Sequence, residues 1–590
     1  MKDFFKNVFA TVLGIILFLV VMGLFGVMSI IGMVAAGEQT KSVKKNSVLV
    51  MELNGTLNER AEASLLSELS RNRVQDLGLD DMLAAVKKAQ DNDKIKGIYI
   101  EVGAFTPDSY ASLQALRRAL ADFRKSGKWI VAYGDSYTQG SYYLASVANQ
   151  VWLNPQGMVD WHGLAAQKTY LKGLMEKFGV KMQVAKVGSY KSAVEQFTTD
   201  KMSDADREQT EAYINGIWQQ VTADVAASRK LTAATLNAYA DSLITLADSK
   251  QYVTAKLVDK LLYTNQVKDE VKKLLEIDED DDINQLSISD MKNVKDKNRD
   301  GEQIAVYYAY GDIVDGAASN AMSRSHEIDA QVVCKDLEKL MNDDDIKAVV
   351  LRINSGGGSA YASEQIWHQI MELKAKKPIV VSMGGMAASG GYYISAPANW
   401  IVAEPTTLTG SIGIFGMFPD MSGLLTDKLG LKFDEVATNK FSGMGSSARP
   451  FSPEEMAHLE SYIDRGYKLF RQRVADGRKL TIDQVEAIAQ GHVWLGKDAL
   501  GIRLVDQLGS LDDAVAKAAK LAKLDEYHTN SYPGESDWIE SFLNEAEGGN
   551  YLDSQLRLAM GEFYEPFLLM RTLNRQDAIQ ARVPYYINIR

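Results

Sequence analysis

Short apolar runs alternate with segments that carry apolar residues at helical spacing along most of the chain. Residues 348–353 form one such run, Ala-Val-Val-Leu-Arg-Ile, and a glycine-rich stretch follows it. Apolar side chains then recur every three or four positions, which predicts a helix over residues 362–374. The next apolar run, residues 378–383, predicts another strand. This alternation predicts an α/β domain whose helices pack on a sheet.

The pattern occurs twice along the chain, with a constant offset. The sequence Gly-Ser-Tyr-Tyr-Leu at 140–144 aligns with Gly-Gly-Tyr-Tyr-Ile at 390–394, an offset of 390 − 140 = 250 residues. The same offset places Gly163 on Gly413. A period of this length is that of a whole domain, so we predict a duplicated fold rather than a short solenoid repeat.

Shifts in composition divide the chain into five parts. Residues 1–46 form an apolar segment and a polar tether, and residues 47–275 form the first repeat. Residues 276–302 open with a run of acidic side chains, which is typical of a solvated linker. The second repeat covers residues 303–524, and the tail, residues 525–590, has no counterpart in the first repeat. We therefore expect two tandem domains joined by an acidic linker.

The N-terminal part is apolar over a long stretch, because residues 8–36 contain no charged side chain. A stretch of this length can cross the hydrocarbon core of a bilayer, about 30 Å thick, as a helix. A cleaved signal peptide usually has an apolar region of only about 7–15 residues. We therefore predict an uncleaved transmembrane helix, although small residues at 34–37 leave cleavage open. Lysines flank both sides, so the positive-inside rule does not decide the orientation.

Length, charge and cysteine content indicate several domains and argue against a nucleic-acid-binding protein. The chain has 590 residues, more than one hydrophobic core usually contains, which agrees with several domains. Its formal net charge of −12 argues against a nucleic-acid partner, because such proteins usually carry a basic face. Its single cysteine, Cys334, has no partner for an internal disulfide, and its position predicts a buried residue on a helix.

The two repeats differ in the polar residues that could carry chemistry. Ser389 of the second repeat aligns with Gln139 of the first, and Ser411 aligns with Trp161. With one residue inserted in the second repeat, Lys191 of the first aligns with a residue that is not lysine. One repeat therefore has the serines and the other has the lysine. Together they contain a nucleophile and a base.

Ser389 lies among small residues at a predicted strand-to-helix turn, where few bulky neighbours cover its hydroxyl. The unpaired N–H groups of a helix N-terminus favour an alkoxide or an oxyanion nearby. Ser389 is therefore a candidate nucleophile, and a plain N-cap serine is the alternative.

A second glycine-rich segment, residues 354–359, follows a predicted buried strand. Its glycines let the backbone approach a ligand closely. The amides of Gly357 and Gly358, together with that of Gly390, are therefore a candidate oxyanion hole, and a tight turn is the alternative. The Gly-Lys-Ser/Thr ending of a phosphate-binding loop is absent from this segment, which argues against a nucleotide site.

A serine nucleophile needs a general base at neutral pH. None of the six histidines lies beside a Gly-x-Ser-x-Gly elbow, so a lysine is the better candidate. Lowering the pKa of a lysine from about 10.4 to about 7 costs roughly 4.6 kcal/mol, which desolvation can supply. Lys191 lies in a partly apolar segment and is the candidate base. Ser411 is a candidate for orienting the amine, and a polar turn residue is the alternative.

Three segments together resemble the bacterial signal peptide peptidase A family, also called protease IV, in its long duplicated form. These segments are residues 190–195 (Tyr-Lys-Ser-Ala-Val-Glu), 382–392 (Ser-Met-Gly-Gly-Met-Ala-Ala-Ser-Gly-Gly-Tyr) and 407–413 (Thr-Leu-Thr-Gly-Ser-Ile-Gly). The resemblance runs over most of residues 1–530. It implies two tandem domains of the Clp protease/crotonase fold, an α/β spiral of ββα units, preceded by one transmembrane helix.

The resemblance also gives each candidate a role. It implies that Ser389 is the nucleophile, that Lys191 is the general base, and that Ser411 orients the lysine. It implies no cofactor and no metal. The chain departs from the family pattern at Gly356, where a proline is common, and its tail past residue 530 matches poorly.

Location and substrate are further expectations from the resemblance. Members cross the bacterial inner membrane once, keep their catalytic domains on the periplasmic side, and assemble into bowl-like homo-oligomers, for which a tetramer is expected here. They degrade signal peptides that remain in the membrane after secretion. We therefore expect a membrane-anchored serine endopeptidase with a Ser/Lys dyad that cleaves hydrophobic peptides. A crotonase-like acyl-CoA enzyme and a non-catalytic membrane scaffold that binds peptides are the two alternatives.

Overall fold

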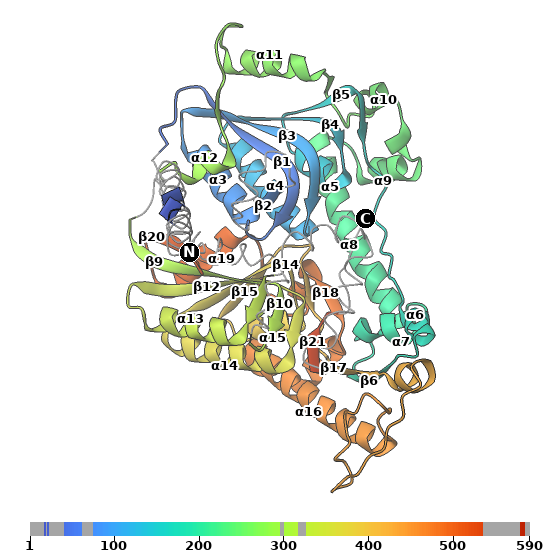
Figure 1. Cartoon of the computed structure of the whole chain (residues 1–590). Helices are drawn as coiled ribbons and strands as arrows, with labels where there is room; N and C mark the ends of the chain where they lie inside the picture. Colours follow the sequence, from blue (N-terminus) through green and yellow to red (C-terminus); the bar gives the residue numbers. More distant parts are fainter. Residues whose placement is uncertain are drawn as a thin grey trace, which may run out of the picture.

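The two repeats form two α/β units that lie one above the other in Figure 1. The computed structural model describes residues 14, 17–18, 21–22, 41–61, 75–295, 300–316, 326–534 and 579–583. The predicted membrane helix, residues 8–36, lies outside the described residues apart from the five positions just given. Within the described parts of the chain, no helix has the length and apolarity needed to span a membrane.

The first unit is built on a parallel sheet, in which the strand order is β2-β1-β3-β4-β5-β7 and β8 pairs with β1. The long helices of this unit, α3, α4, α8 and α11, contribute buried apolar residues to its cores. Its strands are β1 (Ser47–Asn58), β2 (Gln75–Gly78), β3 (Ile95–Pro107), β4 (Trp129–Tyr137), β5 (Gln150–Val159), β7 (Lys260–Leu261) and β8 (Asn284–Leu286). Its helices are α3 (Leu79–Asp91), α4 (Tyr110–Lys125), α5 (Gln139–Ala145), α6 (Lys172–Lys177), α7 (Glu195–Thr198), α8 (Asp204–Arg229), α9 (Ala233–Asp241), α10 (Ser249–Thr254), α11 (Thr264–Leu275) and α12 (Ile288–Lys292).

The second unit repeats this plan, with the strand order β18-β16-β14-β12-β9-β20, and with β15 paired to β14 and β19 paired to β15. The predicted strand, helix and strand after residue 348 are β12, α14 and β14, each longer than predicted. The strands of this sheet are β9 (Glu302–Tyr310), β12 (Ile346–Ser355), β14 (Ile379–Ala388), β15 (Trp400–Ala403), β16 (Leu408–Gly410), β18 (Val493–Leu495), β19 (Gln507–Leu508) and β20 (Tyr527–Tyr532). The helices are α13 (Ala330–Asn342), α14 (Ala360–Lys376), α15 (Gly390–Ser395), α16 (Pro453–Arg478), α17 (Ile482–Ile488), α18 (Gly496–Gly501) and α19 (Leu511–Ala522).

Equivalent elements start at nearly constant offsets, so the predicted duplication is confirmed. The offset is 360 − 110 = 250 between α4 and α14, 379 − 129 = 250 between β4 and β14, and 453 − 204 = 249 between α8 and α16. The matching strand orders show that the offset relates whole folds and not only short motifs.

The structure differs from the predicted linker and tail, because each contains a strand of the adjoining unit. Within the expected linker, β8 pairs with β1, and Leu286 and Met291 are buried in the first core. Within the expected tail, β20 pairs with β9 in the second sheet. Both strands follow the last long helix of their repeat and extend the same edge of the sheet. The acidic run led us to predict a linker, although apolar residues of the first core follow it. Each repeat therefore contains one more strand than its composition indicates.

Cys334 lies on α13, as predicted for a helix position, but it is only partly buried against the second core. Burial raises the pKa of its thiol to about 11, so the thiol stays protonated at neutral pH. This agrees with a structural role.

Polar contacts join the two units along their interface. Arg352 of β12 forms an ion pair with Glu59 at the end of β1, and the two side chains are 4% and 3% exposed. On α4, Gln114 Oε1 accepts a hydrogen bond of 3.0 Å from Thr406 Oγ1 of the second unit. The units therefore form one continuous body.

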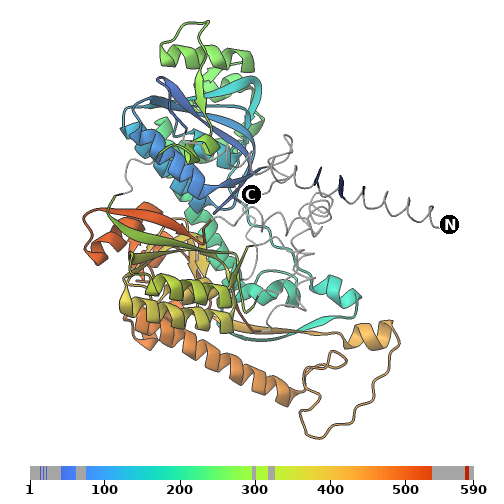
Figure 2. The same ribbon diagram turned by 60° about the vertical axis from the view of Figure 1, so that its left-hand side comes forward.

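A third sheet takes strands from both repeats and from the tail, in the order β11-β10-β13-β21-β17-β6. In Figure 2 its long β6–β17 ladder runs outward beside α16, below the two main units. This sheet links the two repeats, because β6 of the first repeat pairs with β17 of the second. Its strands are β6 (Lys181–Val187), β10 (Asp312–Val314), β11 (Glu327–Asp329), β13 (Gly357–Ser359), β17 (Ile414–Asp420) and β21 (Ile579–Arg582).

Candidate active site

β14 ends at Ala388, and Ser389 follows as the residue that caps the N-terminus of α15. The backbone of Ser389 has φ +54° and ψ −114°, a region that residues other than glycine rarely adopt. Such a conformation costs about 1–3 kcal/mol and is usually found at functional sites. Within the described residues, the Ser389 hydroxyl makes no N-cap hydrogen bond to α15. The plain N-cap alternative is therefore wrong.

Strand pairing brings Lys191 of the first repeat to this turn of the second. β6 and β17 pair antiparallel, with Val187 opposite Ile414. Lys191 follows Val187 by 191 − 187 = 4 residues, and Ser411 precedes Ile414 by 414 − 411 = 3 residues. Both residues therefore leave the ladder at the same end, which is where they meet.

The amine of Lys191 lies between two serine hydroxyls. Its Nζ is 2.7 Å from Ser389 Oγ, 3.1 Å from Ser411 Oγ and 3.2 Å from the Ser411 carbonyl oxygen. All three residues are 0% exposed. Burial lowers the pKa of Lys191 well below its ordinary value, because the charged amine loses its hydration. Burial therefore favours the neutral form of this amine, which is the form that can act as a base.

The three contacts fit a neutral amine, which has two N–H groups and one lone pair. The N–H groups can donate to the Ser411 hydroxyl and to the Ser411 carbonyl oxygen. The lone pair is then left for the O–H of Ser389. Ser411 itself has φ +50°, so its backbone is also held in the left-handed region, which residues other than glycine adopt infrequently.

A short segment of the second unit, Gln490–His492, binds the turns that carry Lys191 and Ser411 through backbone hydrogen bonds. The carbonyl of Gln490 accepts from the Tyr190 N–H at 2.9 Å, and the carbonyl of His492 accepts from the Ser411 N–H at 2.7 Å. Between them, Gly491 has φ +79°, and a Cβ there would lie 2.7 Å from the Cβ of Lys191. Sequence reasoning missed this segment, in which the glycine was the available signal.

The three glycines predicted to form an oxyanion hole lie together beside Ser389, although their amides differ. The Gly357 N–H donates to Ser355 Oγ at 3.1 Å, so this amide already has a partner. Gly358 lies in β13, and Gly390 is the first residue of α15. A Cβ on Gly357 would lie 2.7 Å from the Gly390 nitrogen, which is closer than real contacts allow. The glycines are therefore needed for this close approach.

A strand from the C-terminal tail, β21, lies along the glycine segment. It pairs antiparallel with β13 on one edge and with β17 on the other. The carbonyl oxygen of Ala581 would lie 2.1 Å from a Cβ on Gly357 and 2.9 Å from a Cβ on Gly390. An extended backbone thus fits beside Ser389, with one carbonyl oxygen against both glycines.

The residue aligned with Lys191 in the second repeat lies elsewhere. Ser442 is exposed, in an arm of residues 421–450 that projects beyond β17 (Figure 2). Within the described residues, this arm contains no strand equivalent to β6. The second repeat therefore has no element that could bring a residue at this position back to the sheet.

Comparison with known proteins gives the family. The Peptidase family S49 model matches residues 122–278 and 371–525, and the Clp protease model matches residues 303–401. Protease 4 of Salmonella typhi is 38% identical over 548 residues, which cover 90% of this chain and 87% of that protein. The chain belongs to peptidase family S49.

Other relatives of this S49 peptidase extend the same picture. Protease 4 of Haemophilus influenzae is 34% identical, with 88% of this chain and 85% of that protein covered. The chloroplastic serine protease SPPA of Arabidopsis thaliana is 31% identical, with 82% of this chain and 70% of that protein covered. The predicted family resemblance is thus confirmed, and the chain is a serine peptidase with a duplicated, mixed α/β fold of the Clp protease type.

Proposed function

We propose that this S49 peptidase is a membrane-anchored endopeptidase with a Ser389/Lys191 dyad. The observation that carries the proposal is the 2.7 Å contact between Ser389 Oγ and Lys191 Nζ, two fully buried groups from different repeats. The strained backbone of Ser389 and the dry surroundings of Lys191 are what a nucleophile and a neutral base require.

The reaction is acyl transfer to serine, followed by hydrolysis. Ser389 Oγ attacks the carbonyl carbon of a peptide bond while Lys191 Nζ takes the hydroxyl proton. Backbone amides near Gly358 and Gly390 stabilise the oxyanion of the tetrahedral intermediate. The ammonium of Lys191 then protonates the leaving amine, and the neutral lysine next activates a water molecule that hydrolyses the ester. Ser411 keeps the lone pair of the lysine directed at the reacting oxygen.

The substrate class is an extended peptide with apolar side chains. β21 supports the first part, because it is an extended segment held between β13 and β17 with its Ala581 carbonyl against Gly357 and Gly390. Main-chain pairing of this kind binds peptides with little regard to sequence. Signal peptides that remain in a membrane after secretion are extended or readily extended, apolar and close to an anchored enzyme, which makes them the proposed substrates.

Family membership and the geometry of the site both argue against the two alternative functions, a crotonase-like acyl-CoA enzyme and a non-catalytic peptide-binding scaffold. An acyl-CoA enzyme would need neither a buried lysine against Ser389 nor a site for an extended backbone. A non-catalytic scaffold would have no reason to keep a strained serine beside a desolvated amine. Both are therefore set aside in favour of the serine peptidase.

We place the enzyme in the bacterial inner membrane with its catalytic units on the periplasmic side. The uncharged stretch over residues 8–36 supports the anchor. Deleting residues 1–40 should move the peptidase from the membrane to the soluble fraction after cell breakage. In spheroplasts, externally added protease should degrade the catalytic units of the full chain. Protection of those units would contradict the proposed orientation.

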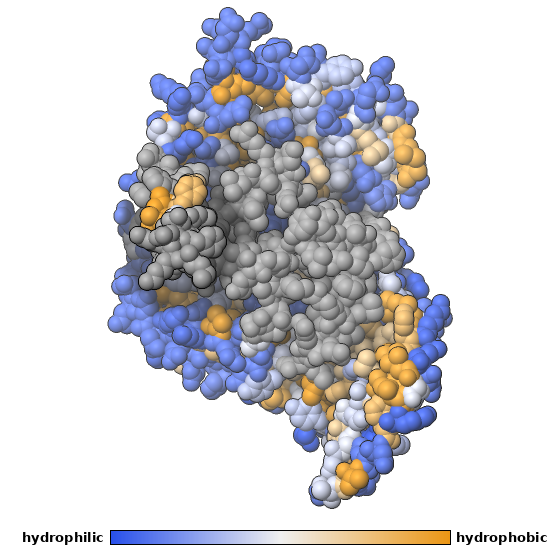
Figure 3. Space-filling model, viewed as in Figure 1, coloured by the Kyte–Doolittle hydropathy of each residue, from blue (hydrophilic) through white to orange (hydrophobic). Residues whose placement is uncertain are grey.

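We also propose a homo-oligomer, expected to be a tetramer. Exposed apolar side chains support it, because Phe178, Leu429, Phe433 and Val436 are 60%, 61%, 55% and 99% exposed. In Figure 3 the orange surface at the lower right lies over α6 and the neighbouring arm; Phe178 directly follows α6, and the other three residues belong to the arm, residues 421–450. A second copy of the chain would cover such a patch. Light scattering of the detergent-solubilised protein should give several chains per particle, and Val436→Asp together with Phe433→Asp should lower that number.

An acylating serine probe tests the dyad in the purified full-length protein. We expect one adduct, on Ser389, that disappears in Lys191→Ala. Lys440→Ala is the matched control, because Lys440 lies near the aligned position in the other repeat but is 66% exposed and paired with Glu454. An adduct on another residue, or full labelling in Lys191→Ala, would remove the proposed mechanism.

A further inference from the structure

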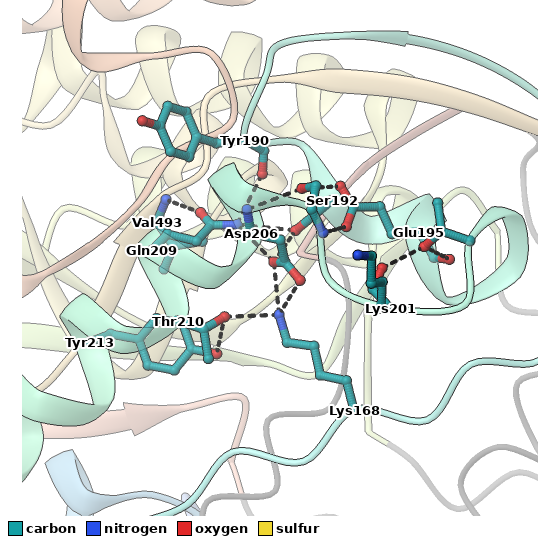
Figure 4. A network of polar contacts seen from close by, with 12 residues as sticks. Lys168, Tyr190, Ser192, Glu195, Lys201, Asp206, Gln209, Thr210, Tyr213 and Val493 are labelled. Carbon is teal, nitrogen blue, oxygen red and sulfur yellow. Dashed lines mark hydrogen bonds and ion pairs between the residues drawn. The ribbon is translucent and has the colours of Figure 1, made fainter.

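Both neighbours of Lys191 are held by one buried side chain of α8, Gln209 (Figure 4). Gln209 Nε2 donates to the Tyr190 carbonyl oxygen at 3.1 Å and to Ser192 Oγ at 3.0 Å. Gln209 Oε1 accepts from the Val493 N–H at 3.2 Å. Only this orientation of the amide gives the carbonyl a donor and the N–H an acceptor. Gln209 is 0% exposed, so these bonds do not compete with water.

These contacts join the base to the second unit from two sides. Val493 directly follows the segment Gln490–His492, which binds the turns of Lys191 and Ser411 through its backbone. Gln209 binds the same stretch from the first unit, through Val493. A change in the Gln209 amide would therefore alter the distance between Lys191 and Ser389 without touching either group.

A buried ion pair lies behind Gln209 and fixes its amide. Asp206 Oδ1 accepts from Gln209 Nε2 at 3.1 Å and from Ser192 Oγ at 2.6 Å. Lys168 Nζ lies 2.7 Å and 2.6 Å from the two carboxylate oxygens and 2.9 Å from Thr210 Oγ1. The pair is nearly buried, with the side chains of Lys168 and Asp206 9% and 1% exposed. Because its charges are opposite and adjacent, it adds little net field at the nearby base.

We infer that Gln209 is a positioning residue for the general base, and that the Asp206–Lys168 ion pair holds the Gln209 amide in its working orientation. This inference rests on the proposed Ser389/Lys191 dyad. Gln209 does not contact a reacting atom in this arrangement. It acts through Tyr190 and Ser192, and so through the backbone that carries the amine.

Titratable groups around this turn come from several elements. On α8 they are Asp206 and Glu208, and Glu208 accepts from the Tyr190 hydroxyl at 3.2 Å. In Figure 4, Lys168 lies below the Asp206 carboxylate, and Glu195 and Lys201 lie to its right. The His492 ring lies against that of Tyr190, with ring centroids 4.4 Å apart, and burial lowers its pKa, which favours the neutral ring.

Two variants of Gln209 test the inference in the full-length enzyme with a peptide substrate. Gln209→Met keeps the shape and removes the hydrogen bonds, and we expect kcat to fall about 10- to 100-fold with little change in KM. Looser packing also rehydrates Lys191, so the acidic limb of kcat/KM should move to higher pH. Gln209→Glu keeps the acceptor for Val493 but adds a buried negative charge, which favours the ammonium. Its limb should move further, by about one pH unit or more.

Gln114→Ala is the matched control, because Gln114 is also a buried glutamine that binds the opposite unit, through Thr406. It should lower the melting temperature without moving the pH limb. If the Gln209 variants behave like Gln114→Ala, Gln209 is merely structural and the inference fails. If instead Lys191→Ala keeps full activity in the same assay, the proposed dyad fails, and the two failures are thereby distinguished.

Ser192→Ala covers the case in which Gln209→Met does not fold. It removes one hydroxyl that binds both Gln209 and Asp206. We expect a smaller shift of the acidic limb in the same direction and a fall in kcat of a fewfold. A limb at the wild-type position in folded Ser192→Ala would overturn the inference.

Discussion

The strand-to-helix turn after β4 in the first repeat and the one after β14 in the second occupy the same place in their sheets, but their backbones differ. In the first repeat, Thr138 caps α5 with φ −70°, and its hydroxyl accepts from the Ser141 N–H at 3.2 Å. In the second, Ser389 takes the capping position with φ +54° and no side-chain cap bond within the described residues. The first turn is relaxed and satisfied, whereas the second is strained and keeps its hydroxyl for Lys191.

The neighbouring positions differ in the same sense. Gln139 binds the backbone of Gly163 twice, at 3.0 Å through each end of its amide. Trp161 fills the position of Ser411, is 0% exposed, and donates from its ring to the Leu236 carbonyl at 2.9 Å. Amide and indole thus fill the region that holds the lysine amine in the other repeat. The comparison teaches that this fold forms without a strained turn or a buried amine, and that the site at Ser389 contains both.

The largest effect should come from removing the nucleophile. Ser389→Ala should lower kcat by about 10⁴-fold or more, because the acyl-enzyme can no longer form. Gln139→Ala, at the aligned position, should leave kcat unchanged and only reduce stability. Steady-state hydrolysis of a peptide substrate measures both. Comparable losses of kcat in the two variants would mean that the repeats are not divided in function as described.

The second pair of aligned residues should separate stability from catalysis. Trp161→Ala should lower the free energy of unfolding by about 3–5 kcal/mol, because it leaves a cavity in the first core. Ser411→Ala should lower kcat about 10- to 100-fold with a much smaller loss of stability, since the amine loses its orienting hydroxyl. Denaturant unfolding gives the free energy of unfolding and steady-state kinetics gives kcat, both measured on the same preparations of each variant. A Ser411→Ala enzyme with normal kcat would leave Ser411 without its proposed role.

The desolvated amine should show in the pH dependence of stability. The pKa of Lys191 is lowered by burial in the folded state and is about 10.4 in the unfolded state. Between these two values the unfolded chain binds more protons, so the stability of the wild type rises with pH. Lys191→Met lacks this contribution. We expect it to melt above the wild type near neutral pH, with the difference shrinking as the pH approaches about 10. A difference that is independent of pH would indicate a charged lysine.

The smallest effect concerns the strained turn itself. Ser389→Gly should raise the free energy of unfolding by about 1 kcal/mol, because glycine adopts φ +54° without the penalty. Gln139→Gly should have the opposite sign, since its residue has an ordinary helical start and useful hydrogen bonds. Thermal melting measures the stability of both variants, Ser389→Gly and Gln139→Gly. A destabilising Ser389→Gly would place the strain elsewhere.

Much of the fold and the meeting of Ser389, Ser411 and Lys191 could be predicted from the sequence. Alternating strands and helices gave the α/β units, and the 250-residue offset brought Ser389, Ser411 and Lys191 into one comparison. These signals are local or periodic, so a single chain displays them. Family resemblance then supplied the roles, which the residues alone left open between a nucleophile and an N-cap.

Three other features could not be predicted, because they depend on contacts between segments far apart in the sequence. The pairing of β6 with β17 joins residues more than 200 positions apart, and it is the reason that Lys191 reaches Ser389. In the sequence, Gln209 is an ordinary polar residue of a long helix. Only the fold shows that its side chain binds both Val493 and Tyr190. The tail has no counterpart in the first repeat and no role was predicted for it, but its strand β21 pairs with β13 beside the glycines. Tertiary packing decides such contacts, not propensity.

The separation of the two residues of the proposed dyad along the chain has a consequence for biosynthesis. Lys191 is made 198 residues before Ser389, and the ladder that joins them needs β17, which is made later still. Domains fold in order as they leave the ribosome, so a half-finished chain has a completed first repeat and no functioning hydrolase. Division of the site between the repeats thus acts as a built-in delay. Under the proposed mechanism, peptidase activity can therefore begin only after translation has passed β17.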